Sequence, residues 1–305
     1  MTRSLPGIAA CAALLFAGAT ATFAQEGNWR RVEPENLVVL TLPDGEVLIE
    51  LAPAFAPRTV AQFKELVANG FYDGLEFYRV IDGFVAQGGD GSDMAGTAPA
   101  VSLLPPEFER AWSDELPFVS VQRPDMFAPE TGFIDGFAAA RDPEAGRVWL
   151  THCPGIVAMA RNNEPDTGST DFYIVIGQAP RYLDRNLTIF GRVIDGMEVV
   201  QRIHRGRVEA NGMIPEGEPR TPILDASLGT SLPAAELGVV EVEDTGSAAF
   251  ARVLEARRVR GPPFFHHRPP EVLDVCQVPV ATRRLPAAAA ADETPPEPAP
   301  GGDAQ

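Results

Sequence analysis

The chain has 305 residues, of which 45% are hydrophobic, and its formal net charge is −17 at pH 7. This length permits one large domain or two small ones. Sequence-independent binding of nucleic acid requires neutralisation of phosphates, so such an acidic chain is not expected to bind nucleic acid.

The first residues resemble a secretory signal peptide. Arg3 supplies a positive start, residues 8–18 form an apolar stretch too short to span a bilayer, and Thr22-Phe23-Ala24 offers a cleavage site. The alternative is a cytoplasmic protein with an Ala-rich start. We expect residues 1–24 to be a signal peptide, so that the protein is exported to the periplasm of a bacterial envelope. No later segment is long and apolar enough to predict a membrane span.

Two strand-like runs follow, at 37–42 and 46–51. Pro43-Asp44-Gly45 joins them, and Asp-Gly between apolar runs indicates a β-hairpin.

A helix is predicted next. Pro57 suits its first turn, where no amide donor is needed, and Gly70 is placed to end it. Val60, Phe63 and Val67 recur at helical spacing.

Short runs rich in β-branched and aromatic residues then recur at 77–81, 155–159, 171–176 and 187–193. A second helix is predicted at about 196–204, where Asp195 and Glu198 form a capping-box-like start. Many short strands with two helices indicate a mostly β fold, a barrel closed at its ends by the helices.

Three stretches exceed a minimal barrel. Residues 91–150 form an insertion too long for a plain loop, and residues 233–285 form a C-terminal extension with its own apolar positions. We expect both to pack on the barrel. Residues 286–305 are rich in Pro and Ala, lack apolar side chains that could offset ordering entropy, and are predicted to be disordered.

Two cysteines remain outside the signal peptide, Cys153 and Cys276. Export would permit a disulfide between them, which would tie the extension to the barrel; two separate buried thiols are the alternative.

The stretch 71–90 places Arg79 and Gln87 among strand-forming apolar residues. Buried polar groups must be hydrogen-bonded. From strand chemistry alone, the two side chains either brace each other inside the barrel or face a cleft.

This stretch resembles the cyclophilin signature, in which an Arg precedes an aromatic-containing Gln-Gly-Gly-Asp segment, here Gln87-Gly88-Gly89-Asp90. The resemblance covers residues 36–232, apart from the insertion. It rests also on Gly45, Leu51, Ala56-Pro57 and Phe63 upstream, and on 155–161, 172–174, 182–184 and 190–191 downstream.

The resemblance implies a closed, eight-stranded antiparallel cyclophilin-like β-barrel capped by two α-helices. It implies a peptidyl-prolyl cis–trans isomerase (rotamase) that acts on proline-containing polypeptides and assists protein folding. Rotation about an amide breaks no covalent bond, so no cofactor or metal is expected. We expect the protein to be a monomer.

The resemblance also assigns the site. Arg79 would donate a hydrogen bond to the prolyl nitrogen, and Phe84 and Gln87 would complete the catalytic set. Substrate-binding positions carried over from the family are Val85, Ala160, Arg161, Asn162, Asp171, Tyr173, Tyr182, Leu183 and Leu187.

Three positions depart from the family pattern. Tyr78 and Leu187 stand where many members have His, and Asp171 stands where most have Gln. Asp171 and Tyr173 are two residues apart, so on one strand they would share a face. The Asp171 carboxylate would then lie near Arg79 and compete for its donors. The alternative function is therefore a catalytically weak or inactive proline-binding, chaperone or scaffold module of cyclophilin fold.

Overall fold

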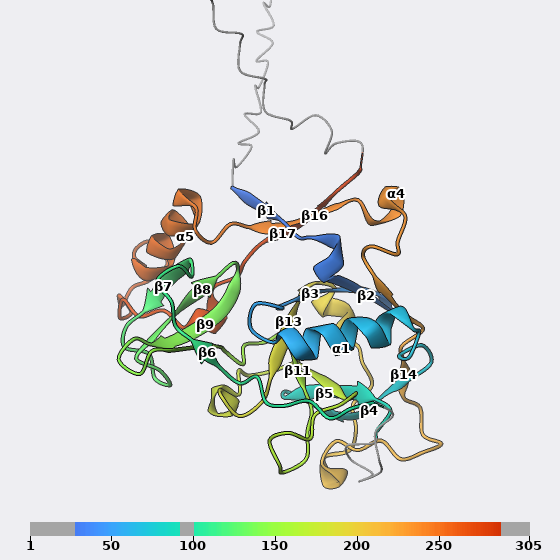
Figure 1. The fold of residues 1–305 in the computed structure, drawn as a ribbon. Helices are drawn as coiled ribbons and strands as arrows, with labels where there is room; N and C mark the ends of the chain where they lie inside the picture. The colour runs from blue at the N-terminus through green and yellow to red at the C-terminus, as the bar shows by residue number, and fades with distance from the viewer. Residues whose placement is uncertain (1–27, 92–100, 288–305) are drawn as a thin grey trace, which may run out of the picture.

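The structure is a computed structural model that describes residues 28–91 and 101–287. The expected signal peptide and nearly all of the expected tail lie outside the described residues, as do residues 92–100 of the insertion. Three antiparallel sheets make up the described chain: a nine-stranded sheet, a five-stranded sheet and a three-stranded sheet (Figure 1). In this part of the chain, no helix is both long and apolar enough to cross a membrane.

The nine-stranded sheet curls into the barrel that the sequence predicts. Its strands, in spatial order, are β14 (Thr221–Pro222), β4 (Glu76–Ile81), β5 (Val85–Gly89), β12 (Phe172–Val175), β11 (Ile156–Met159), β13 (Ile189–Asp195), β3 (Gly45–Leu51), β2 (Leu37–Leu42) and β15 (Asp225–Leu228). The predicted hairpin is confirmed, because β2 and β3 pair from Leu37↔Glu50 to Leu42↔Gly45.

One chain segment closes this sheet. Its first part, β14, pairs with β4, and its second part, β15, pairs with β2 at the opposite edge. Between them, Ile223 exchanges backbone hydrogen bonds with the Gly74–Leu75 turn, and the Leu224 amide donates to the Thr41 carbonyl. The resemblance implies eight strands, whereas the sheet has nine, because the segment that closes it is divided into β14 and β15.

Two helices fill the ends of the barrel. Helix α1 (Pro57–Ala68) contributes Val60, Phe63, Leu66 and Val67 to the barrel core, and α3 (Met197–Val200) contributes Val199 and Val200. Pro57 opens α1 at a position where no amide donor is needed. The next two amides, of Arg58 and Thr59, donate to the Glu107 carboxylate of the insertion at 3.0 and 2.9 Å.

The second helix is shorter than predicted, and its start differs. Its N-cap is Gly196, at a φ of 86°, and no side-chain bond caps the helix. A Cβ at Gly196 would lie 2.3 Å from the Glu46 carbonyl oxygen of β3. The close approach of two backbones therefore sets this helix start, in place of the predicted capping box.

The two faces of the barrel strands have different partners. On β5 and β12, the side chains of Ala86, Phe172 and Ile174 belong to the barrel core. Their neighbours Val85 and Tyr173 belong to a second apolar cluster outside the barrel. This alternation, which follows from the period of two in a strand, leaves one outer face of the barrel to be covered by other parts of the chain.

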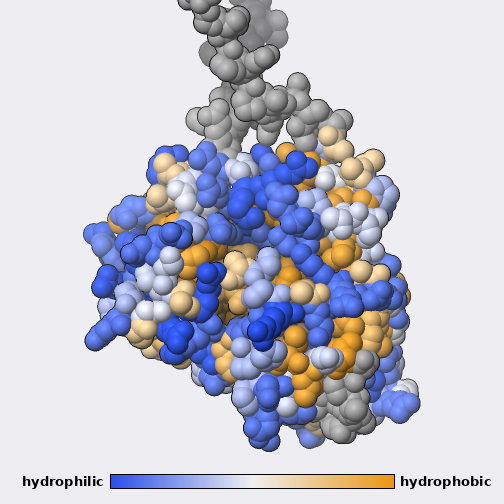
Figure 2. Space-filling model, in the orientation of Figure 1, coloured by the Kyte–Doolittle hydropathy of each residue, from blue (hydrophilic) through white to orange (hydrophobic). Residues whose placement is uncertain are grey.

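The insertion covers part of that outer face. It forms the five-stranded sheet, whose strands in spatial order are β6 (Arg110–Ala111), β10 (Arg147–Leu150), β9 (Phe137–Asp142), β8 (Glu130–Ile134) and β7 (Phe118–Gln122). Phe133, Phe137 and Leu150 from this sheet join the outer apolar cluster. Figure 2 shows a largely hydrophilic face on which hydrophobic residues are visible where the insertion meets the barrel.

The C-terminal extension packs in two places. Its elements are α4 (Ala234–Leu237), β16 (Val239–Glu243), α5 (Ala248–Arg258), the short 3₁₀ turn η4 (Val275–Gln277) and β17 (Thr282–Leu285). Strand β16 lies between β17 and the N-terminal β1 (Trp29–Arg31), and Val240 and Val242 pack on the hairpin β2–β3. Phe250 of α5 meets Phe133 edge to face, with ring centroids 5.4 Å apart.

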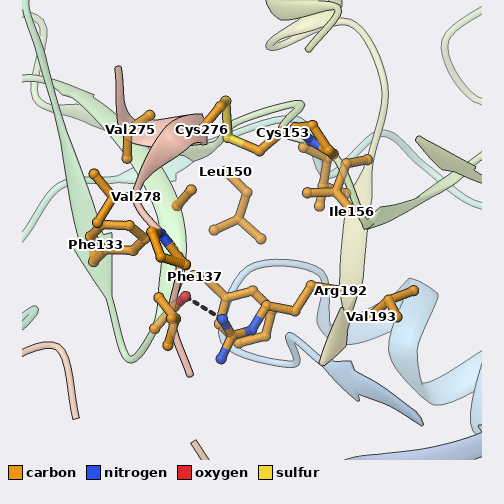
Figure 3. A pocket seen from close by; sticks show the side chains of 16 residues that line it. Phe133, Phe137, Leu150, Cys153, Ile156, Arg192, Val193, Val275, Cys276 and Val278 are labelled. Carbon is orange, nitrogen blue, oxygen red and sulfur yellow. Dashed lines mark hydrogen bonds between the residues drawn. A yellow bond between two sulfur atoms is a disulfide. The ribbon is translucent and has the colours of Figure 1, made fainter. Parts of the chain in front are cut away.

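A disulfide joins the extension to the barrel. Cys153, just before β11, is bonded to Cys276 of η4, with Cα atoms 4.9 Å apart. Beside it lies a cavity of about 190 Å³ whose walls come from barrel, insertion and extension together. Figure 3 shows the disulfide on one side of this cavity and Arg192 of β13 on another, donating to the Gly136 carbonyl at 2.6 Å.

Candidate active site

A β-bulge in β4 places the polar side chains of the site. The register between β4 and β5 shifts between Phe77 and Arg79, so that Tyr78 is the extra residue. Phe77 and Val80 both point into the barrel core although they are three residues apart, which regular alternation would forbid. The bulge thereby turns Tyr78 and Arg79 away from the core.

Two acceptors hold the partly buried Arg79 side chain. Its Nη1 donates to Gln87 Oε1 at 2.9 Å, and its Nε donates to the Asn211 carbonyl at 3.2 Å. Burial lowers the pKa of Arg79 from its ordinary value, and Tyr78 partly offsets that shift. A guanidinium remains protonated in proteins, so Arg79 presents a fixed cation whose remaining N–H groups can serve a ligand.

The partner of Arg79, Gln87, is itself held. It is 4% exposed, and its Nε2 donates to the Tyr78 hydroxyl at 2.7 Å. Tyr78 donates in turn to Asp171 Oδ2 at 2.8 Å, and the Gly91 amide donates to Asp171 Oδ1 at 3.0 Å. Arg79 and Gln87 therefore brace each other and also face a cleft, which combines the two alternatives that strand chemistry left open.

Tyr173 has its own buried support. Its hydroxyl lies 2.9 Å from His152 Nε2, and His152 Nδ1 lies 3.1 Å from Asp184 Oδ1. An ionised carboxylate only accepts, so in the neutral imidazole Nδ1 donates to Asp184 and Nε2 accepts from Tyr173. Burial, and then the charge of Asp184, raise the pKa of Tyr173. Tyr173 therefore stays neutral and presents its ring to the cleft.

These side chains surround a cavity of about 290 Å³ on the outer face of the barrel. Its lining residues are Arg79, Phe84, Val85, Gln87, Ala160, Arg161, Tyr173, Leu183, Leu187 and Asn211. Apolar groups form most of the wall, and two cations, Arg79 and Arg161, also line it. Such a cavity can hold a compact apolar ring while the Arg79 guanidinium donates to an atom of that ring.

The structure contradicts the expectation for Asp171. This residue is fully buried, precedes β12 and does not line the cavity. Among the residues that the structure describes, no ion pair joins Asp171 to Arg79. The Asp171 carboxylate bonds instead to Tyr78, and Tyr78 and Gln87 lie between it and Arg79 in the hydrogen-bond chain.

Two further predicted residues lie outside the lining of this cavity. Tyr182 is 68% exposed, although its neighbour Leu183 lines the cavity. Asn162 is exposed, and its backbone amide donates to the Thr167 hydroxyl at 3.0 Å. Both adjoin lining residues in sequence, so they belong to the surroundings of the cavity.

Sequence reasoning missed Asn211 and His152. Asn211 has a left-handed φ of 52°, and the Asn211-Gly212 dipeptide is a turn signal, but no sequence pattern places that turn beside β4. His152 is fully buried. It is not adjacent in sequence to either Tyr173 or Asp184, so only the fold reveals the three-residue chain.

Comparison with known proteins agrees with this geometry. Residues 37–224 match the family model described as "Cyclophilin type peptidyl-prolyl cis-trans isomerase/CLD". A Brucella suis protein named "Probable peptidyl-prolyl cis-trans isomerase" is 33% identical over 193 residues, which is 60% of this chain and 78% of the relative. The mouse protein "Peptidyl-prolyl cis-trans isomerase-like 1" is 34% identical over 181 residues, covering 59% of this chain and 84% of the relative.

A solved structure extends the likeness beyond the barrel. The crystal structure of cyclophilin AquaCyp293 from Hirschia baltica matches with a TM-score of 0.70 and 30% identity, and covers 85% of this chain and 94% of its own. The matching family model spans more than half of the chain and includes the strands that carry Arg79, Gln87 and Tyr173. This chain therefore belongs to the cyclophilin-type peptidyl-prolyl cis–trans isomerases.

Proposed function

We propose that this isomerase acts on Xaa-Pro bonds of exported or envelope polypeptides through the cavity beside Arg79. The observation that carries the proposal is the placement of Arg79, whose guanidinium is held by Gln87 at the side of an apolar cavity of about 290 Å³. The proline ring of a client would occupy the cavity, against Phe84, Val85 and Tyr173.

The energetics suit this arrangement. Rotation about the amide has a barrier of about 18–20 kcal/mol because of its partial double-bond character. A donor aimed at the prolyl nitrogen withdraws the lone pair from amide resonance. A thousandfold acceleration requires about 4 kcal/mol, and a charge-assisted hydrogen bond contributes about 1.5–3 kcal/mol. Apolar contacts that favour the twisted ring would supply the remainder.

Asp171 does not interfere with this role. Its carboxylate is engaged by Tyr78 and Gly91, so the competition for Arg79 that would favour an inactive binding module has no support in the geometry. The catalytic function is favoured for that reason.

The proposed location rests on different observations. The N-terminal sequence has the features of a signal peptide, and the bond between Cys153 and Cys276 is of a kind that persists in oxidising compartments. Expression in a bacterial host should yield a periplasmic protein whose N-terminus, read by mass spectrometry, is Gln25. Recovery of the intact chain from the cytoplasm would contradict export.

The catalytic proposal is tested by Arg79→Ala. We expect kcat/KM for an Ala-Pro-containing peptide to fall at least tenfold, a loss of about 1.4 kcal/mol of transition-state stabilisation, with the melting temperature little changed. A matched control is Arg207→Ala, because Arg207 is a surface residue, 66% exposed and paired with Glu218. Full activity in a folded Arg79→Ala protein would contradict the assignment.

A further inference from the structure

A buried hydrogen-bond chain leads from Arg79 to Asp171. Its links are Arg79 Nη1 to Gln87 Oε1 at 2.9 Å, Gln87 Nε2 to the Tyr78 hydroxyl at 2.7 Å, and Tyr78 to Asp171 Oδ2 at 2.8 Å. Gln87, Tyr78 and Asp171 are 4%, 5% and 0% exposed. The chain therefore continues two residues beyond the one that contacts Arg79.

The donors and acceptors of this chain have a fixed direction. An ionised carboxylate can only accept, so the single Tyr78 proton goes to Asp171. The Tyr78 oxygen then accepts, and only the Nε2 end of the Gln87 amide can donate to it. The opposite end of that amide, Oε1, must face Arg79. The hydrogen bond that Asp171 accepts from Tyr78 thus decides which end of Gln87 meets the guanidinium.

The reverse orientation of the Gln87 amide would break its hydrogen bond to Arg79. An amide turned by half a rotation would present Nε2 to Arg79 Nη1, with two donors facing each other and neither bonded. Buried donors without partners are costly, so the Arg79 side chain would move to find another acceptor. A side chain that must aim at one atom of a bound ring loses its effect when it is displaced.

We propose that Tyr78 and Asp171 are positioning residues that fix the Gln87 amide and, through it, the direction of the Arg79 guanidinium. This inference rests on the catalytic role proposed for Arg79. Two of the three positions that depart from the family pattern, Tyr78 and Asp171, then act as one unit. The bulge in β4 brings the Tyr78 hydroxyl to Gln87, and the Gly91 amide holds the other carboxylate oxygen in place.

The first experiment is Tyr78→Phe, which removes the link and keeps the ring. Exchange NMR on a proline peptide measures kcat and peptide affinity separately. We expect kcat to fall about threefold to tenfold, the effect of about one net hydrogen bond, and the peptide dissociation constant to stay within about twofold. The matched control is Tyr72→Phe, which removes a buried hydroxyl that donates to the Thr170 carbonyl at 2.8 Å. The control should retain wild-type kcat.

The second experiment reverses the direction of the chain. In Asp171→Asn, the new amide has a single oxygen, whereas the present carboxylate accepts from both Gly91 and Tyr78. If its nitrogen faces Tyr78, the hydroxyl must donate to Gln87 and turn that amide. We expect kcat to fall about threefold to tenfold. In Gln87→Glu the Tyr78 proton lies between two carboxylates, and kcat should fall as well.

The double variant Asp171→Asn with Gln87→Glu again matches a donor with an acceptor at each link from residue 171 to Arg79. The Asn amide donates to Tyr78, Tyr78 donates to the new carboxylate, and that carboxylate accepts from Arg79. In the wild-type background, which has Gln87, Asp171→Asn should therefore lower kcat. In the Gln87→Glu background, the same substitution should raise kcat at least about threefold. A role limited to packing or to bulk charge would change kcat in the same direction in both backgrounds.

The outcomes separate the two proposals. Wild-type kcat in a folded Tyr78→Phe protein, or a fall on Asp171→Asn in both backgrounds, overturns the positioning role. If Arg79→Ala itself leaves kcat unchanged, the proposed catalytic role fails, whatever Tyr78 does. Both proposals are supported if Arg79→Ala lowers kcat and if Asp171→Asn lowers kcat in the wild-type background but raises it in the Gln87→Glu background.

Discussion

At the scale of single residues, the cavity wall depends on polar groups that a client never touches. Tyr173 contributes its ring to the cavity, while its hydroxyl meets His152, and His152 meets Asp184. Asp184 also accepts from Arg181 Nε at 2.6 Å. Each of these buried polar atoms has a partner, as buried groups require. These hydrogen bonds fix the Tyr173 side of the cavity wall, and they are separate from the hydrogen bonds that hold Arg79.

The hydrogen bonds from Tyr173 through His152 to Asp184 lead to a prediction about stability. Tyr173→Phe keeps the ring but leaves His152 Nε2 buried without its donor. We expect the free energy of unfolding to fall by about 1–3 kcal/mol, measured by urea denaturation. Peptide affinity should change little, since the wall stays apolar. The control Tyr182→Phe alters an exposed side chain and should stay within about 0.5 kcal/mol of wild type. Equal stability of the two variants would mean that the His152 bond contributes nothing.

At the scale of elements, local patterns were sufficient for the regular parts. The Asp44-Gly45 turn correctly predicted the β2–β3 hairpin, and the apolar spacing from Val60 correctly predicted α1. The bulge at Tyr78 could not be predicted from the sequence. In a bulge, two residues of one strand lie opposite a single residue of its partner, and this depends on how β4 pairs with β5. For that reason the sequence could not indicate that Asp171 bonds to Tyr78 and not to Arg79.

The buried carboxylate of Glu50 is a second meeting point of elements. The barrel strands, the insertion and the N-terminal segment all contribute groups around it. Glu50 of β3 is 4% exposed, and it pairs with Arg192 of β13 at 2.8 Å and with Arg30 of β1 at 2.5 Å. Arg192 and Arg30 donate onward to the carbonyls of Gly136 and Asp135 in the insertion. Burial lowers the pKa of Arg192, and the charge of Glu50 and its hydrogen bond oppose that shift.

Glu50→Gln should therefore lower the stability of the fold strongly. Removing the charge leaves two guanidinium groups together without their anion, and breaking a buried pair costs about 3–5 kcal/mol. Thermal unfolding should show a large drop in melting temperature. Glu46→Gln is the matched control, because Glu46 pairs with Arg284 at 2.9 Å near the surface, and exposed pairs contribute about 0–1 kcal/mol. Similar melting temperatures for the two variants would contradict the role assigned to Glu50.

At the scale of the whole molecule, the insertion and the extension share one apolar cluster with the outer face of the barrel. Phe133 of the insertion, Phe250 of the extension and Ile156 of the barrel all belong to it. The cavity beside the disulfide has walls from all three parts (Figure 3). Composition could indicate that both segments carry apolar residues, but their burial on one another depends on contacts between distant parts of the chain.

The disulfide should stabilise this arrangement without serving catalysis. Cys153 and Cys276 are 123 residues apart, and in the chain-entropy model a loop of about 100 residues contributes roughly 4.7 kcal/mol, although measured values are often about 2–4 kcal/mol. We expect Cys276→Ser to lower the free energy of unfolding by about 2–4 kcal/mol. Neither cysteine lines the cavity beside Arg79, so kcat/KM should remain near wild type at temperatures where the variant is folded. Dithiothreitol should lower the melting temperature of the wild type and leave that of Cys276→Ser unchanged. If the reductant lowers both equally, the stabilisation comes from packing of the extension and the covalent bond adds nothing to it.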